Sequence, residues 1–548
     1  MYLGIDIGST SLKAAAFDAR RGRLLAQTEQ RLPLDMDGTG KREQDPAALI
    51  CALSAAANLL RHQVGGRWPH VRGIGLATQG GSTILVNRKT GAPSTPMFLW
   101  NDTRAFGHFH KIAAKFPPRW WRAFSLSDGP GMGLARALWM REKWPRLFKG
   151  NPLCVGAGEH IYFALTGEWR QDACHALQSG CYDAVRNRIT TRPLAELGLP
   201  TDFFAPLRQG HEMHPLTQEA ATLLQLPAGI PVAGPYNDHE AGYLSVLHAS
   251  RLPLECSLGT AWVGNFVLPP TLAGGAPFQI CIAAPTGNGR QVIMPLMTGN
   301  VTLDWALATF VHADHKTALA QADGILSKQL LPPPGLVALP WLNRPNALRP
   351  AQTGSAAFFG IGPSTTHADL FRAVVAAMTF EFARVFDRVA KSGAVDSLVL
   401  CGGTARSAHI RSLFAALFAP LPVHRVIETE LMGTRGCLYA FDPKIANAAV
   451  ETVRCGAGLD RKALAEARSL YLETFERLYG HVRVGEPYAL SRLGGVMCDG
   501  KQGAAVCNRR RSLAHPIAAA VTNRRSLNNA ATPTSSSESS RLKTRIRK

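Results

Sequence analysis

The chain has 548 residues, which exceeds one ordinary domain and favours two, with room for an appended segment. Its hydrophobic fraction of 46% and charged fraction of 18% are typical of a soluble globular protein. We expect no membrane partner, because no apolar run approaches the roughly 18–20 residues that cross a bilayer. The first residues also lack the basic and apolar regions of a signal peptide, so we expect a cytoplasmic protein.

The formal net charge of +21 is concentrated at the C-terminal end. Residues 501–548 hold eleven Lys or Arg and a single acid, Glu538, and so contribute +10. Low hydrophobicity with high charge predicts a disordered basic tail over 491–548. An RNA- or DNA-binding arm is the alternative, but no aromatic residue lies among the basic ones to stack on bases. We therefore do not expect a nucleic-acid partner.

Eleven cysteines are scattered along the chain without a CxxC or Cys/His spacing. This pattern favours reduced, buried thiols over a disulfide framework or a zinc site. One pairing, Cys174 with Cys181, stays open as a minor alternative.

The first half predicts an α/β domain with a mixed sheet. Short connections between the first three strand-like segments indicate antiparallel pairing. Asp45 is the expected N-cap of a helix that has Pro46 at its first position. The expected strands are 1–8, 11–18, 23–30, 71–77 and 231–233, the last stopped by Gly234 and Pro235, and the expected helix is 45–61.

The second half opens in the same way, with a strand, a Gly-Thr turn and a strand over 256–268. The shared opening indicates duplication at the scale of domains. We therefore predict one domain over 1–246 and another over 252–485, with the boundary near 246–252. The further expected elements are a strand at 397–401 and helices at 371–391, 407–418, 433–441 and 461–479.

Two turns have the residues of phosphate-binding loops. Asp6-Ile7-Gly8-Ser9-Thr10 lies between two strands, where small residues let backbone N–H groups approach a phosphate and a carboxylate can hold Mg²⁺. Ser257-Leu258-Gly259-Thr260 is the matching turn of the second half. A tight hairpin with a satisfied Asp is the alternative for the first turn alone, and the coincidence of the two turns favours a polyphosphate site.

Two further segments are candidates for ligand binding and catalysis. Gly402-Gly403 follows an apolar strand and opens a helix, so it suits a planar ligand such as adenosine, or an ordinary turn. Asp238 lies where a strand gives way to a helix, and it is either an N-cap or a base that takes a hydroxyl proton. His239 and Glu240 are the alternatives for the base.

Together these motifs resemble the FGGY family of carbohydrate kinases over roughly residues 1–485. The segments that carry the resemblance follow the family's order: LGIDIGSTSLKAAAFD, REQDPAAL, FLWNDTRA, IYFALTGEW, CSLGTA, AAFFGIGPSTTHADLFRAVVAAMTFE and CGGTARS.

The resemblance implies two actin-like (ribonuclease H-like) ATPase domains with a cleft between them, where ATP–Mg²⁺ meets a small sugar or polyol. It implies Asp238 as the general base and Asp6 near the metal. The implied ligand contacts are Gly8, Ser9, Thr10, Lys13, Gly259 and Thr260 at the phosphates, Gly402, Gly403 and Ser407 at adenosine, and Gln79, Trp100, Asp102, Arg104 and Asp238 at the sugar.

The chain departs from the family's patterns at several positions. Gly80 and Gly81 stand where xylulose kinases have Met-His and glycerol kinases Arg-Glu, so we expect a wider pocket there. We also expect Gly80→Met with Gly81→His to shift preference toward D-xylulose. Ala376-Ala377 replaces a Glu-Gly pair and Trp262 is bulky for its place, and we expect both to be packing changes.

The predicted activity is ATP-dependent phosphorylation of a hydroxyl of a small sugar or polyol, with a ketose such as xylulose first. Kinases for erythritol-like polyols or glycerol, and a non-catalytic sugar- or nucleotide-binding relative, stay open as alternatives. A homodimer is open as well.

Overall fold

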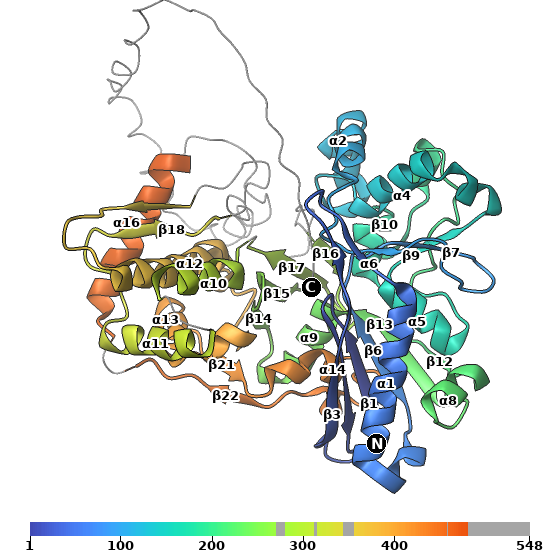
Figure 1. The fold of residues 1–548 in the computed structure, drawn as a ribbon. Coiled ribbons are helices and arrows are strands. Elements are labelled where there is room, and N and C mark those ends of the chain that lie inside the picture. Colours follow the sequence, from blue (N-terminus) through green and yellow to red (C-terminus); the bar gives the residue numbers. More distant parts are fainter. Residues whose placement is uncertain (270–279, 297, 312–314, 343–355, 457–458, 480–548) are drawn as a thin grey trace, which may run out of the picture. The chain divides into compact units, whose positions relative to one another are not determined.

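The structure of the protein is a computed structural model that describes residues 1–269, 280–296, 298–311, 315–342, 356–456 and 459–479 (Figure 1). The predicted tail over 491–548 lies outside these residues.

The first half contains a six-stranded sheet in the order β12-β13-β6-β1-β2-β3. β1 pairs antiparallel with β2, and β2 with β3, as the short connections predicted. β6 then adds parallel to β1, and β13 parallel to β6. The strands are β1 (Tyr2–Ile7), β2 (Ser11–Phe17), β3 (Leu24–Arg31), β6 (Ile74–Thr78), β12 (Met213–Pro215) and β13 (Pro231–Asn237).

Helix α1 (Pro46–Val64) packs against β2 and β3. The Asp45 side chain accepts a hydrogen bond from the Ala47 backbone N–H, which confirms the predicted cap. With the 3-10 helix after it, α1 is long and apolar enough to cross a membrane by length and composition, which we did not expect from the sequence. In the fold its apolar stripe, which includes Leu49, Leu53 and Leu60, is buried against the sheet.

Most of the remaining first half lies between β6 and β13. Its helices α2 to α4 share an aromatic-rich core that includes Phe98, Trp121 and Phe124. The main elements of this region are β7 (Ile84–Val86), β8 (Met97–Phe98), α2 (Phe106–Lys115), α3 (Pro118–Ser125), α4 (Met132–Lys143), β9 (Leu153–Val155), α5 (Ala157–Thr166), α6 (Ala173–Gln178) and α8 (Gln218–Leu224).

The second half contains a seven-stranded sheet in the order β16-β17-β15-β14-β20-β21-β22. β14 and β15 form the antiparallel opening pair, and β20 and β21 add in parallel, as β6 and β13 do in the first sheet. The repeated order confirms the predicted duplication. The strands are β14 (Pro253–Leu258), β15 (Trp262–Leu268), β16 (Ile280–Ala283), β17 (Arg290–Pro295), β20 (Ser397–Cys401), β21 (Val423–Val426) and β22 (Val450–Thr452).

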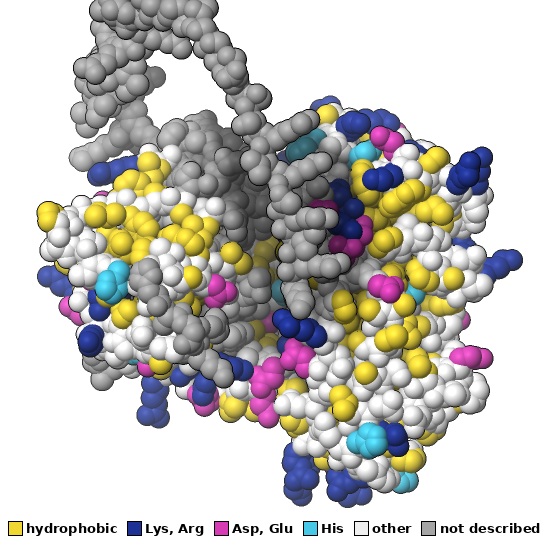
Figure 2. All heavy atoms as spheres, in the orientation of Figure 1, with side chains coloured by type: hydrophobic (Ala, Val, Ile, Leu, Met, Phe, Trp, Pro, Cys, Tyr) yellow, Lys and Arg dark blue, Asp and Glu magenta, His cyan; other side chains and the backbone are white. Residues whose placement is uncertain are grey.

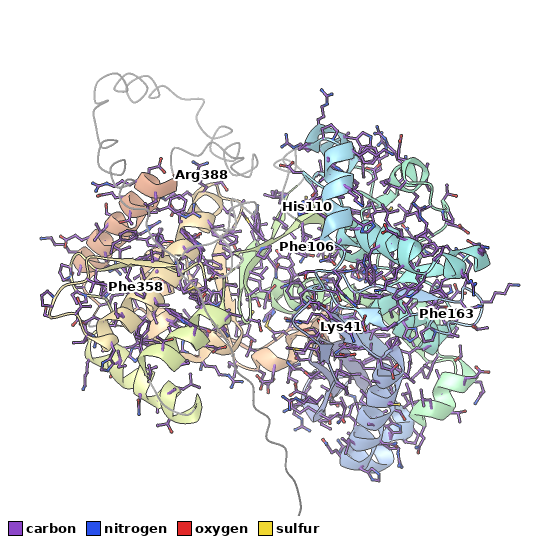
Figure 3. The ribbon with its side chains drawn as sticks, turned by 45° about the horizontal axis from the view of Figure 1, so that its top comes forward. Lys41, Phe106, His110, Phe163, Phe358 and Arg388 are labelled. Atoms are coloured by element: carbon purple, nitrogen blue, oxygen red, sulfur yellow. The ribbon has the colours of Figure 1, made fainter. Side chains whose placement is uncertain are left out.

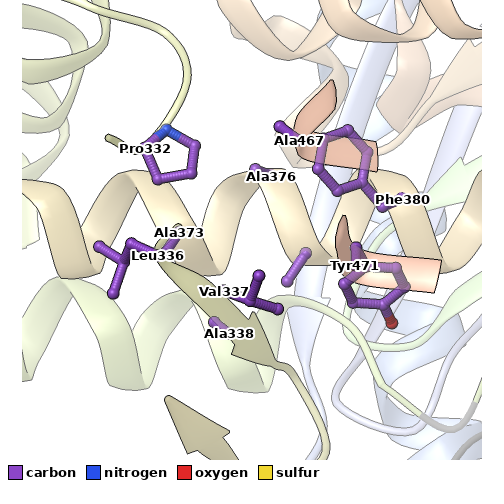
Figure 4. Close-up of a pocket in the computed structure, with 10 residues that line it drawn as sticks. Pro332, Leu336, Val337, Ala338, Ala373, Ala376, Phe380, Ala467 and Tyr471 are labelled. Carbon is purple, nitrogen blue, oxygen red and sulfur yellow. The ribbon is translucent and has the colours of Figure 1, made fainter. Parts of the chain in front are cut away.

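The longest helix of the second half, α12 (His367–Lys391), begins four residues before the predicted start at residue 371. Thr366 caps it, because its hydroxyl accepts from the Asp369 N–H. Ala376 and Ala377 line a small apolar cavity between α12, β18 (Val337–Leu339) and α16 (Arg461–Tyr479) (Figure 4). The alanine pair therefore belongs to core packing. The other helices of this half include α10 (Asn300–Phe310), α11 (His315–Lys328) and α13 (Ala408–Leu417).

Helix α14 (Met432–Gly436) returns from the second sheet to the first. It ends well before the predicted residue 441 and contacts β1, β6 and α9 (Asp238–Val246). The approach is so close that a Cβ on Gly4 would lie 1.7 Å from the Thr434 carbonyl oxygen. Part of the second half therefore shares a core with the first sheet, through Leu431, Cys437 and Leu438.

Candidate active site

Three loops of the first sheet begin at one edge. In the parallel register, Ile7 of β1 lies beside Thr78 of β6, and Thr78 lies beside Asn237 of β13. The segments that follow these strands carry Gly8, Gln79 and Asp238, so the structure brings together three groups that lie far apart in the sequence. Ligands commonly bind at the carboxyl ends of the strands in such sheets.

Asp238 is the first residue of α9, and the N-cap is its neighbour Asn237. The Asn237 side chain accepts from the His239 N–H, so the N-cap alternative for Asp238 is wrong. Gly234 and Pro235 also do not end the strand, because β13 continues through an irregularity in the ladder to Asn237. Such an irregularity leaves residues unpaired and bends the strand just before the candidate base.

Two carboxylates meet at this edge. Burial and then the nearby charge of Asp238 raise the pKa of Asp6 to about 7, while Lys13 and His239 act in the opposite direction. The Asp6 carboxylate has no hydrogen bond to the described residues, and Lys13 lies opposite it in the β1–β2 register. The carboxylates of Asp6 and Asp238 are oxygen donors of the kind that Mg²⁺ prefers, so the residues present fit this ion.

The two alternative bases already have partners. Glu240 is buried, accepts from Arg208 Nη2 at 2.6 Å, and also accepts from the Asn237 N–H at 3.3 Å. His239 Nδ1 lies 3.3 Å from Asn265 Nδ2, which also donates to a buried glutamate, Glu255. Asp238 accepts only from the His239 N–H, at 2.9 Å, among the described residues. This arrangement favours Asp238 as the base.

Each residue of the Glu-Gln-Asp-Pro segment positions a part of the site or its supporting helix. Gln44 Nε2 donates to the Ser9 carbonyl at 2.8 Å and so holds in place the loop that is predicted to bind phosphate. Thr10 in this loop is exposed. Asp45 and Pro46 begin α1. Glu43 Oε1 accepts from Arg104 at 2.6 Å, and its other oxygen lies 3.5 Å from Lys41. Lys41 is labelled in Figure 3.

Asp102 and Arg104, predicted at the sugar, bind each other. Arg104 donates to both Asp102 oxygens at 2.7 to 3.1 Å, and the Arg42 N–H donates to Asp102 as well. The Arg104 guanidinium also lies over the ring of Trp139. Most polar atoms of Asp102 and Arg104 therefore have hydrogen-bond partners within the protein. Trp100, two residues before Asp102, is 52% exposed.

Buried Arg136 of α4 was not predicted as a site residue. It donates to the carbonyls of Gly81 and Trp100, the latter at 2.8 Å, and so ties the Gln79 loop to the Trp100 loop. Burial lowers its pKa to about 10. The signal in the sequence is an arginine within the apolar run GLARALW. Gln79 itself is 5% exposed, and neither of its amide atoms has a hydrogen-bond partner among the described residues.

The expectation of a wider pocket at Gly80 and Gly81 is wrong. A Cβ on Gly80 would lie 2.5 Å from Gln178 Oε1 and 2.6 Å from Asn237 Nδ2. Side chains from α6 and from the end of β13 therefore take up the space that the two glycines leave. Gln178 was missed because α6 is nearly one hundred residues away in the sequence.

The predicted nucleotide loops meet in the second sheet. Gly402 has a φ of +87°, and a Cβ there would lie 2.6 Å from the Leu258 carbonyl carbon, next to Gly259. Asn300 joins the two loops, because its N–H donates to Gly259 O at 3.1 Å and its Oδ1 accepts from Thr404 Oγ1 at 2.5 Å. Asn300 was not predicted from the sequence.

The neighbours of these loops have structural roles. Ser407 is the N-cap of α13 and accepts from the Ile410 N–H. Trp262 is fully buried beside Phe382 and Phe414, and its Nε1 donates to Asn300 at 3.2 Å. The tryptophan therefore belongs to the core below the second loop, which begins at Gly259 and Thr260.

Comparison with solved structures identifies the architecture. The fold is similar to the crystal structure of xylulose kinase from Rhodospirillum rubrum, with a TM-score of 0.76 at 21% identity, covering 87% of this chain and 98% of that one. It is also similar to Plasmodium falciparum glycerol kinase with ADP, with a TM-score of 0.73 at 14% identity and coverage of 87% and 98%. The predicted two-domain, actin-like fold is confirmed.

The sequence identifies the family. It matches the FGGY family of carbohydrate kinases with the N-terminal domain over residues 1–245 and the C-terminal domain over 256–435. The chain belongs to this family and is a carbohydrate kinase, a phosphotransferase with an alcohol group as acceptor. It is 26% identical to the xylulose kinase of Escherichia coli K12 over 421 residues, which covers 76% of this chain and 84% of that protein. It is also 24% identical to the glycerol kinase of Paracidovorax citrulli over 465 residues, covering 79% and 88%.

Proposed function

We propose that the protein transfers the γ-phosphoryl group of ATP to a hydroxyl of an open-chain ketose or polyol of four to six carbons, with a ketopentose such as xylulose first. The observation that carries this proposal is Asp238, which stands at the end of β13 with one backbone hydrogen bond and beside Asp6. Relatives named xylulose kinase support the choice of acceptor.

The residues at the strand ends have different roles in phosphoryl transfer. Asp238 takes the proton of the acceptor hydroxyl. Asp6 would hold Mg²⁺, which neutralises charge on the transferred phosphoryl group when bound. The backbone turns at Gly8 and at Gly259-Thr260 contact the phosphates, and Gly402-Gly403 lies against adenosine. Positioning of this kind supplies most of the rate enhancement in phosphoryl transfer.

The sugar contacts are proposed from exposure and from free polar atoms. Trp100 presents an exposed ring that can pack on sugar C–H bonds, and Gln79 has both amide atoms available. Asp102 and Arg104 hold the Trp100 loop in place. The free thiols of all nine described cysteines, Cys174 and Cys181 included, suit a reducing compartment, so we propose a cytoplasmic enzyme.

Asp238→Asn tests the base. The change keeps the shape and removes the proton acceptor, so turnover should fall by roughly 10²- to 10⁴-fold while the KM for the sugar changes little. Asp202→Asn, at an exposed surface pair with Arg88, is the matched control and should leave turnover unchanged. Turnover of Asp238→Asn near that of the wild type would contradict the assignment.

The acceptor is tested with a panel of pentuloses, hexuloses, tetritols and glycerol in an ADP-release assay. Glycerol should be poor, because the Arg-Glu pair of glycerol kinases is replaced by Gly80 and Gly81. Glycerol as the best acceptor would contradict the proposed substrate class.

A further inference from the structure

We propose that Gln178, the last residue of α6, contacts the acceptor sugar and determines which acceptors the enzyme takes. This proposal rests on the proposed sugar-kinase function, and it gives Gln178 the place that loop side chains hold in other members of the family. Three observations carry it: the position of its amide, the unpaired polar atoms around it, and the way α6 is anchored.

The Gln178 amide lies over the backbone of the Gly80-Gly81 loop. A Cβ on Gly81 would be 3.1 Å from Gln178 Oε1 and 3.2 Å from Trp100 Cβ, and a Cβ on Gly80 would be in closer contact still. The amide oxygen therefore lies close to the loop backbone, near Trp100 Cβ on one side and Asn237, the residue before the candidate base, on the other. A side chain at position 80 or 81 would therefore contact the Gln178 amide.

Three amide atoms at this place are buried and have no partner among the described residues. Gln178 Oε1 is buried without a hydrogen-bond partner among the described residues, and so are both amide atoms of Gln79. An unpaired buried polar atom destabilises the ligand-free protein, and a ligand that supplies the partner would recover this cost. An amide both donates and accepts, as sugar hydroxyls do, so adjacent hydroxyls of a polyol chain are the chemistry that satisfies this pair.

The second half of the protein anchors α6. Asp172 caps the helix by accepting from the His175 N–H at 2.8 Å. Cys174 and Leu177 then pack in the same core as Cys281 and other residues of the second sheet. The position of the amide is thus set by packing between the halves of the protein.

Two variants at position 178 test the proposal. Gln178→Leu keeps the bulk and removes the polar atoms, and Gln178→Glu keeps the shape and removes the donor. The kcat/KM for the best acceptor should fall about 10- to 100-fold in Gln178→Leu, as expected for a lost hydrogen bond to a substrate hydroxyl. The KM for ATP should stay within about twofold, and the ranking of acceptors should change in both variants. Gln218→Ala, at an exposed glutamine of α8, is the control.

The outcomes separate this inference from the function on which it rests. An active wild-type enzyme whose acceptor ranking is the same in both variants would overturn the role of Gln178 alone. Equal losses for every acceptor and for ATP would show a structural role and would overturn it as well. A wild-type enzyme that phosphorylates no member of the panel would overturn the proposed function, and the inference with it.

Discussion

The polar residues proposed at the sugar differ in whether their side-chain atoms already have hydrogen-bond partners within the protein. Asp102 and Arg104 form an ion pair with several hydrogen bonds, so replacing Arg104 would leave the buried Asp102 carboxylate without its charged partner, whereas replacing Asp102 would leave Arg104 paired with Glu43. Gln79 and Gln178 keep unpaired amide atoms at the same place. We therefore expect changes at Asp102 to act through the shape of the Trp100 loop, and changes at the two glutamines to act on the substrate itself.

Gly80→Ala should impair the enzyme. Its Cβ would lie 2.6 Å from Asn237 Nδ2, and Asn237 is buried and caps the helix that begins with Asp238. We expect kcat/KM for the sugar to fall at least about tenfold, as small displacements of reacting groups commonly cause. For the same reason Gly80→Met with Gly81→His, which from sequence should favour D-xylulose, should instead disrupt the site. Steady-state kinetics with xylulose checks both, and undiminished activity of Gly80→Ala would contradict the close packing.

Asp6→Asn should stabilise the protein without ligands while it weakens Mg²⁺-dependent nucleotide binding. Burial and Asp238 raise the pKa of Asp6 to about 7, so stability of the wild type falls as pH rises from about 4 to 7. An amide escapes this cost, so Tm should be about 2–4 °C higher at pH 8 and the gain should shrink toward pH 5. Thermal unfolding with and without Mg²⁺ and ADP measures this. An equal gain at both pH values would show that the charge of Asp6 is not its cause.

At the scale of elements, the docking of α14 on the first sheet links the two halves. A Cβ on Gly433 would lie 2.2 Å from Asp6 Oδ2, so the helix backbone forms one wall of the carboxylate site. The helix is only five residues long, and its place follows from contacts with β1 and α9 more than from its own propensity.

Gly433→Ala should therefore push α14 away from Asp6. Overpacking of this kind costs about 1–3 kcal/mol, so we expect a lower Tm and reduced turnover together. Gly324→Ala in α11 is the matched control, because a Cβ there meets nothing within 4 Å. The close approach would be refuted if the two variants behaved alike.

At the scale of the whole molecule, charge is unevenly distributed along the chain, because residues 501–548 contribute +10 of the net +21. On the face in Figure 2, Lys and Arg side chains are scattered among acidic and apolar ones, with no continuous basic stripe in the part of the chain described.

Removal of residues 491–548 should leave kinase activity and the thermal transition unchanged, and should remove +10 of the net charge. Calorimetry and the ADP-release assay on the shortened chain measure this, with RNA and DNA binding compared at the same salt. Loss of the cooperative transition would show that the tail is structural, and loss of specific nucleic-acid affinity would give it a binding role.

Local patterns determined much of the protein by themselves. The hairpins of both sheets, the Asp45 cap, the glycine turns and the duplication follow from residues that are neighbours in the sequence, and the structure has each of them. The order of the motifs also determined the family. Short-range hydrogen bonding and strand periodicity are enough for these features.

Only the tertiary structure decided which side chains are free to bind. Arg104 with Glu43, Gln178 over Gly80, and α14 against Asp6 are contacts between residues that lie about sixty to more than four hundred positions apart. Such contacts depend on how buried surfaces fit, and a pattern along the chain does not encode them. The arrangement of the candidate site therefore follows from packing between elements, while Asp6 and Asp238 could be proposed from the sequence alone.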